Sequence, residues 1–139
     1  MFDYNIFDNI GIAMHKAKSY SRIKKELKKS DLTLEDKIQL CQERKEKLSA
    51  SISSLEDSVM YAKEIRDDAV DAWIDEYGTG DEKNDFFDAM DECHEEDKAF
   101  EDALDRLLEC EGAIKAYEKA INVINKEMSK KPTKAASRR

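Results

Sequence analysis

Turn-forming residues are scarce in this chain: its 139 residues include four glycines and one proline, Pro132. A β fold needs turn signals about every 8–12 residues, whereas long solvated helices do not. No stretch approaches the ~18 consecutive apolar residues of a membrane span. The apolar residues 1–11 include Asp3 and Asp8 and lack the early positive charge of a signal peptide. These absences predict an all-α protein that does not enter a membrane.

Cysteine and histidine are also few, with three and two residues. An odd number of cysteines argues against a disulfide framework. Cys41, Cys93 and Cys110 each fall on or beside an apolar helical pattern, so we interpret them as small core residues in a reducing compartment. The sequence therefore predicts a cytoplasmic protein.

Charge, by contrast, is abundant and unevenly distributed. Residues 1–50 hold 11 basic and 8 acidic side chains (+3), residues 51–112 hold 5 and 22 (−17), and residues 113–139 hold 8 and 2 (+6). The formal net charge of −8 therefore hides a strongly polarised chain. This polarity is the most informative feature of the composition.

The clearest pattern predicts one helix from Leu34 to Tyr77. Apolar residues recur about every 3.5 residues along it, as in a helix that packs on another in a coiled coil. Thr33 with Asp36 forms a variant capping box, and Gly78 can take the left-handed conformation that closes a helix. At about 1.5 Å per residue the helix is roughly 65 Å long, so a second long element must lie against it. The seam consists of Leu34, Ile38, Cys41, Lys45, Leu48, Ile52, Leu55, Val59, Ala62, Arg66, Ala69 and Trp73.

A shorter helix is expected from about Asn5 to Lys29. Its second half has a basic back face, which suits either an anionic lipid surface or, more simply, a core helix with solvated lysines. The short connection 30–32 indicates that this helix folds back antiparallel on the 34–62 half of the long helix. Its expected apolar stripe is Ile6, Ile10, Ala13, Ala17, Tyr20 and Leu27, widened by Phe7, Met14 and Ile23.

A third helix is expected to follow residues 78–81 and to run to about Met128, with Thr79 and Glu82 as a second capping box. The spacing of its seam slips beside Gly112, which predicts that the helix is locally overwound or bent. After it, the basic tail 130–139 has no apolar pattern and is expected to be disordered in isolation. The seam consists of Phe86, Met90, Cys93, Asp97, Phe100, Leu104, Leu107, Cys110, Ile114, Tyr117, Ile121, Ile124 and Met128.

Together these elements predict an all-α fold: an elongated antiparallel coiled-coil hairpin of two long helices, with a shorter N-terminal helix on its basal half. The expected organisation is one helical domain, 1–129, followed by the tail 130–139.

No pattern of residues indicates an enzyme, a metal site or a cofactor site. Carboxylate catalysis needs two carboxyl groups in unlike environments across a pocket, and two packed helices leave little room for one. Asp91 and His94 have the spacing of half a di-metal carboxylate motif, but there is a single copy of it. We therefore predict no catalytic residues, no metal and no cofactor.

The strongest signal is acidic: residues 81–111 hold 14 acids and 3 bases. On a straight helix that is one carboxylate per ~3.3 Å, close to the ~3.4 Å charge spacing of one DNA strand. Like charges three or four residues apart repel, so a chain selected for folding alone would alternate them. A solubilising face is the simpler interpretation; a partner-binding acidic rod is the functional one. The residues predicted to bind are Asp85, Asp88, Asp91, Glu92, Glu95, Glu96, Glu101, Asp102 and Asp105.

A second signal is an apolar tip where only two helices are expected to meet. Two helices cannot cover all of its side chains, and Trp and Tyr are typical of interface hot spots. The tip is either a closed cap of the hairpin or an interface with a partner or a second copy. It consists of Trp73, Ile74, Tyr77, Phe86, Phe87 and Met90.

The sequence thus favours a non-enzymatic protein that binds a basic, nucleic-acid-binding protein surface and blocks it. Small size and DNA-like charge spacing are typical of a phage or mobile-element inhibitor. The alternative is a self-assembling coiled-coil adaptor whose basic tail docks on an acidic partner. We expect a homo-oligomer, most simply a dimer, with no direct DNA binding and no membrane contact.

Overall fold

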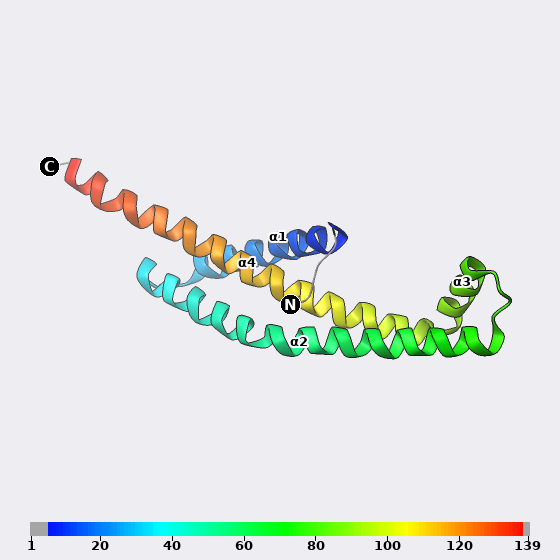
Figure 1. Cartoon of the computed structure of the whole chain (residues 1–139). Helices are drawn as coiled ribbons and strands as arrows, with labels where there is room; N and C mark the ends of the chain where they lie inside the picture. Colours follow the sequence, from blue (N-terminus) through cyan, green and yellow to red (C-terminus); the bar gives the residue numbers. More distant parts are fainter. Residues whose placement is uncertain (1–5, 138–139) are drawn as a thin grey trace. The chain divides into compact units, whose positions relative to one another are not determined.

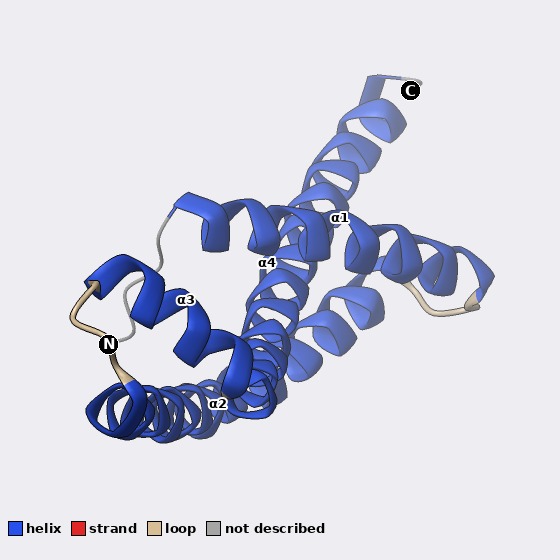
Figure 2. Cartoon of the chain, turned by 90° about the vertical axis from the view of Figure 1, so that its right-hand side faces the viewer, coloured by secondary structure: helices blue, strands red, loops and turns tan. Residues whose placement is uncertain are grey.

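The computed structural model describes the backbone of residues 6–137 and the side chains of residues 9–130. Four helices make up this part of the chain: α1 (Ile6–Lys29), α2 (Leu34–Tyr77), α3 (Glu82–Glu92) and α4 (His94–Ser137). Short loops join α1 to α2 and α2 to α3, and residues 6–137 include no strand (Figure 2). The long helices α2 and α4 pack antiparallel, and α1 also lies on α4 (Figure 1). The predicted all-α class, with its antiparallel long pair and shorter N-terminal helix, is confirmed.

The chain divides into two compact units. Unit 1 comprises Met1–Ile52 and Leu108–Arg139, and unit 2 comprises Ser53–Leu107. Unit 1 has 19 basic and 12 acidic residues, a net charge of +7, whereas unit 2 has 5 and 20, a net charge of −15. The charge polarity of the sequence therefore follows the structural division almost residue for residue.

The α2 seam is confirmed along its whole length. All twelve predicted positions are buried or half-buried, and Cys41 and Val59 are almost completely so. The Thr33 hydroxyl accepts a hydrogen bond from the Asp36 amide at 3.1 Å, as expected of the N-cap. Both ends of this helix lie where the sequence places them.

The end of α2 differs in detail from the prediction. Gly80, with φ of +95°, takes the left-handed conformation, and Gly78 does not. Gly78 is required for space instead: a Cβ there would lie 2.4 Å from the Ile74 carbonyl oxygen, to which the Gly78 amide donates at 2.7 Å. The second cap also differs, because Asp81 caps α3 by accepting from the Asn84 amide at 3.4 Å. The predicted Thr79–Glu82 capping box is wrong.

The predicted third helix is in fact two helices. The break falls at Cys93, whose backbone (φ −98°, ψ 30°) leaves the helical region and whose amide donates to the Ala89 carbonyl. Ala89 and Cys93 pack with Val70 of α2 in a buried cluster of unit 2. We infer that the burial of these small side chains against α2 sets the direction of α3. The sequence does not reveal the break, because the spacing of the apolar seam stays the same on both sides of Cys93.

Gly112 does not interrupt α4. A Cβ on Gly112 would lie 2.6 Å from the His15 Cβ and 2.8 Å from the Lys16 amide nitrogen, so the glycine lets α1 cross α4 at close range. The shift of seam spacing therefore coincides with this crossing. α4 also continues beyond Met128 to Ser137. The side chains of 131–139 lie outside the described residues, so the domain division and the disorder of the tail stay predictions.

α1 buries only part of the stripe that the sequence predicts. Ile23 of that stripe is buried, as are Ile12 and Ser19 outside it, whereas Ile10 and Met14 of the stripe are more than half exposed. α1 packs on small residues of α4. The orientation of α1 therefore follows this close crossing and not its most apolar stripe. Ala13 and Ala17 are exposed, Tyr20 and Leu27 are half-buried, and the side chains of Ile6 and Phe7 lie outside the described residues.

Arg44 of α2 ties the three helices of unit 1 together. Its guanidinium donates to the Glu26 carboxylate of α1 at 2.9 Å and to the Tyr117 hydroxyl of α4 at 3.5 Å. The charged seam residue Lys45 pairs with Glu118 of α4 at 3.5 Å.

Among the described residues, no helix has an apolar stretch of the length that a membrane span requires.

Candidate protein-binding surface

The apolar tip lies in unit 2, where it divides into packed and exposed residues. Trp73, Ile74 and Met90 pack against the buried cluster of Val70, Ala89 and Cys93. The other three are exposed aromatic rings: Tyr77 (58%), Phe86 (49%) and Phe87 (58%).

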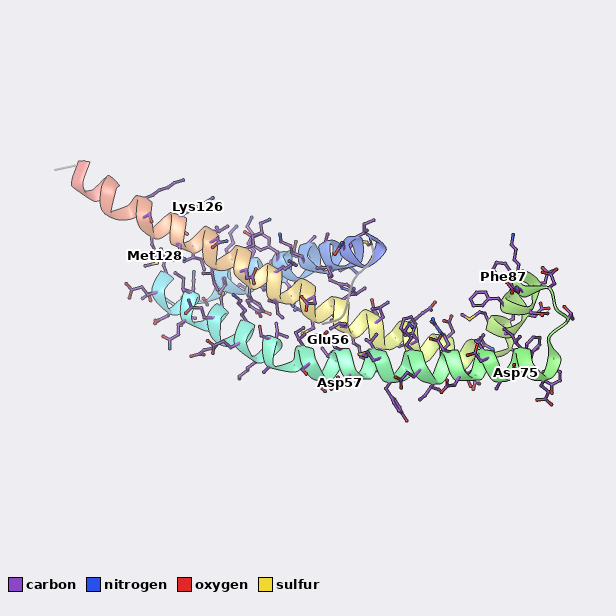
Figure 3. The ribbon with its side chains drawn as sticks, viewed as in Figure 1. Glu56, Asp57, Asp75, Phe87, Lys126 and Met128 are labelled. Carbon is purple, nitrogen blue, oxygen red and sulfur yellow. The ribbon has the colours of Figure 1, made fainter. Side chains whose placement is uncertain are left out.

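The exposed rings form two contacts with defined geometry. Phe86 and Phe87 are edge to face with centroids 6.1 Å apart, and Tyr77 lies 5.4 Å from the half-buried Trp73. Figure 3 shows Phe87 on a side of α3 that does not face α2. Exposed aromatic side chains of this kind are typical of contact surfaces, because they lose little conformational entropy on binding.

Asp85 belongs to the loop rather than to the surface. It is buried, and its carboxylate accepts from the Thr79 amide at 2.9 Å, the Thr79 hydroxyl at 2.8 Å and the Gly80 amide at 3.0 Å. Hydrogen bonds from the Thr79 amide, above all, hold the pKa of Asp85 below its ordinary value. The carboxylate thus organises the turn between α2 and α3, and we leave it out of the binding surface.

We expect Asp85→Asn to lower the melting temperature, because an amide NH₂ would face N–H donors in place of an acceptor oxygen. A lowered pKa in the folded state stabilises the fold above the ordinary aspartate pKa of about 3.9. That stability is lost as the pH falls through the lower folded-state value. Thermal unfolding from about pH 7 to about pH 3 should therefore show a difference between variant and wild type that shrinks in acid.

Asp88→Asn is the matched control, since Asp88 is exposed on the same helix. Its melting temperature should stay unchanged or rise slightly, because Asp88 and Glu92 are like charges at i,i+4 spacing. Equal destabilisation by both variants would contradict the role assigned to the Asp85 carboxylate.

The remaining predicted acids lie on two helices, not on one straight rod. The break at Cys93 separates the α3 acids from those of α4, so the uniform DNA-like spacing along one axis does not hold. Glu96 is half-buried, and the other seven are exposed. We call these seven the acidic surface: Asp88, Asp91, Glu92, Glu95, Glu101, Asp102 and Asp105.

The charged seam residues of unit 2 neutralise each other. Arg66 of α2 donates to Asp97 of α4 at 3.2 Å and lies 4.3 Å over the Phe100 ring. The Arg66 side chain is 18% exposed, so this pair is an internal contact. Arg66 therefore does little to offset the acidic surface.

One exposed apolar patch was missed from the sequence. Met60, Tyr61 and Ile65 of α2 are 54%, 67% and 42% exposed. The signal was present: these apolar residues lie off the seam, where a solvated helix face carries polar side chains.

The three cysteines lie in the core, as the sequence predicts. All three cysteines are buried and unbridged, and burial raises the pKa of the Cys93 thiol, with Glu96 and Glu92 adding to the effect. The exposed His94 ring nitrogen Nδ1 lies 3.1 Å from the Asp91 carbonyl oxygen. In the described part of the chain, no group of three or more His, Cys, Asp and Glu side chains could hold a metal ion.

No protein-family model, no curated protein and no solved structure matches this chain. The surface of unit 2 is therefore what points to a function.

Proposed function

We propose that this protein is a non-enzymatic binding protein whose acidic surface occupies the basic surface of a nucleic-acid-binding protein and blocks it. The observation that carries the proposal is the concentration of charge. Unit 2 has a net charge of −15, and the seven exposed acids of the acidic surface lie on α3 and the first turns of α4 together with the exposed Glu82. The residues of its internal Arg66–Asp97 pair lie largely out of solvent.

Repulsion within this surface supports a binding role. Asp88 and Glu92 are like charges at i,i+4 spacing, as are Glu101 and Asp105, and each such pair costs a few tenths of a kcal/mol. A basic protein surface that normally holds phosphates offers closely spaced Lys and Arg, and contact with it would relieve this repulsion. The break at Cys93 means that the match is to a dense polyanion rather than to one regular strand.

The test begins with a pull-down from the native host, followed by a competition titration on the partner that is retained. Nucleic acid should compete with this protein for the partner, and binding should weaken steeply with salt, because exposed charges are screened beyond about 8–10 Å at physiological ionic strength. The protein alone should bind no DNA. Simultaneous, unchanged binding of both ligands to the partner would contradict the proposal.

Charge neutralisation on α4 identifies the surface. Glu95→Gln, Glu101→Gln and Asp102→Asn together should slow association by about tenfold and change dissociation less, because electrostatic steering acts on the encounter. The control is Asp31→Asn, Glu35→Gln and Glu46→Gln, which removes three exposed charges from unit 1. An equal effect of the control would show that net charge alone matters, and not this surface.

The alternative, a self-assembling adaptor with a docking tail, stays a prediction. The side chains of 131–139 lie outside the described residues, as does the backbone of 138–139. The cytoplasmic location also stays a prediction.

A further inference from the structure

Unit 1 contains a groove with a volume of about 300 Å³ between α1, the start of α2 and α4. Three lysines, Lys24, Lys28 and Lys37, line it together with one acid, Glu127. The volume is at the lower end of the range for small-molecule sites, about 300–1,000 Å³, and so suits a few side chains of a docking protein. The larger apolar lining residues are Tyr20, Leu27, Leu34, Val123 and Ile124.

A second hollow continues the basic character of this face. It shares Val123 with the groove and is otherwise lined by four lysines, one acid and one amide: Lys16, Lys115, Lys119, Lys126, Glu118 and Asn122. Lys119 also lies 4.2 Å over the ring of Tyr20, a groove residue. The groove and the hollow therefore form one surface, apolar at its centre and surrounded by lysines.

The counterpart of this surface is α3 of unit 2. Phe86 and Phe87 form an exposed edge-to-face pair there, and the only base on the helix is Lys83. The exposed acids of α3 are Glu82, Asp88, Asp91 and Glu92. The aromatic pair is thus complementary to the apolar centre of the groove, and the carboxylates around it are opposite in charge to the lysines around the groove.

We infer that α3 of a second copy of this chain docks in the unit 1 groove, with Phe86 and Phe87 on its apolar lining and the α3 carboxylates beside its lysines. Different surfaces of the two copies meet, so the contact is heterologous, and copies can add in succession or close into a ring. This goes beyond the proposed function, which uses the acidic surface of α3 and α4 toward another protein, and the two contacts share Asp88, Asp91 and Glu92 of α3. It also explains why large aromatic residues are exposed at the tip.

Sedimentation velocity across the micromolar range tests the contact on the full chain. The wild type should associate, and less so at about 0.5 M salt, where exposed charges are screened. Lys24→Glu with Lys37→Glu (the groove variant) and Phe86→Gln with Phe87→Gln (the tip variant) should each weaken self-association by about tenfold or more, because the first reverses the lysine charges and the second removes the aromatic anchors.

Mixing the two variants gives the decisive measurement. Each retains one intact surface, so the equimolar mixture should form a 1:1 complex although neither variant associates alone. Misfolded variants would not complement each other, and circular dichroism should show wild-type helix content in both.

The control is Lys25→Glu with Lys47→Glu, an equal change of charge at exposed positions outside both hollows. It should associate nearly as the wild type does. A wild type that stays monomeric, or variants that fail to pair when mixed, would overturn the inference.

Discussion

Ile23→Ala is expected to lower the free energy of unfolding by about 2–5 kcal/mol, the range for a large-to-small change in a core. Ile23 is 1% exposed and belongs to the cluster of unit 1 in which α1, α2 and α4 meet. Cys41 and Tyr117 are buried in the same cluster. These neighbours come from two other helices, α2 and α4, so they cannot all close on the space that the isoleucine leaves. Urea unfolding followed by circular dichroism measures the change.

Ile10→Ala is the control, because it makes the same chemical change on the same helix. The Ile10 side chain is 53% exposed, so its loss should cost less than about 1 kcal/mol. The sequence pattern places Ile10 and Ile23 in one stripe and predicts similar costs for both. If the two variants are equally destabilised, α1 buries the face that the pattern indicates and not the face seen in the structure.

Gly112→Ala is expected to destabilise the protein by about 1–3 kcal/mol, although alanine is the better helix former by up to about 1 kcal/mol. The new Cβ would lie within 3 Å of three atoms of α1: the His15 Cβ, the Lys16 amide nitrogen and the His15 carbonyl carbon. Two of these are backbone atoms, so relief requires α1 to move away from α4. Thermal unfolding should show a lower melting temperature.

Gly11→Ala separates this clash from helix propensity. Gly11 is also in a helix at the contact between α1 and α4, but a Cβ there would meet only the Leu108 Cδ1, at 3.0 Å. That atom is the end of a flexible side chain and can move, so Gly11→Ala should be neutral or stabilising. A stabilising effect of both alanines would show that α1 does not cross α4 closely at Gly112.

The sequence by itself determined the features that depend on local periodicity. The α2 helix begins at Leu34 and ends at Tyr77 as predicted, and all twelve of its seam positions are at least half-buried. Helix propensity, the Thr33 cap and the 3.5-residue repeat act over a few neighbouring residues, so they can be read from the chain alone. The all-α class and the antiparallel long helices follow from them, because short connections join strongly helical segments.

The candidate surface could be predicted in composition but not in arrangement. The acids and the tip aromatics were evident from their types and spacing. Asp85 accepts hydrogen bonds from the loop, and Phe87 is exposed. Both depend on the direction of α3, which ends at the break at Cys93, and no local sequence signal marks that break.

Which helix faces meet could not be predicted from the sequence, because the packing of two helices depends on the sizes of residues that are far apart in the chain. Gly112 leaves room for His15 of α1, and Ile10 of the same helix is exposed. Ala89 and Cys93 pack on Val70 and so end α3 within a continuous seam. The sequence alone does not distinguish a small side chain at a helix–helix contact from one at any other position. Its effect depends on what the fold brings within a few ångströms of it.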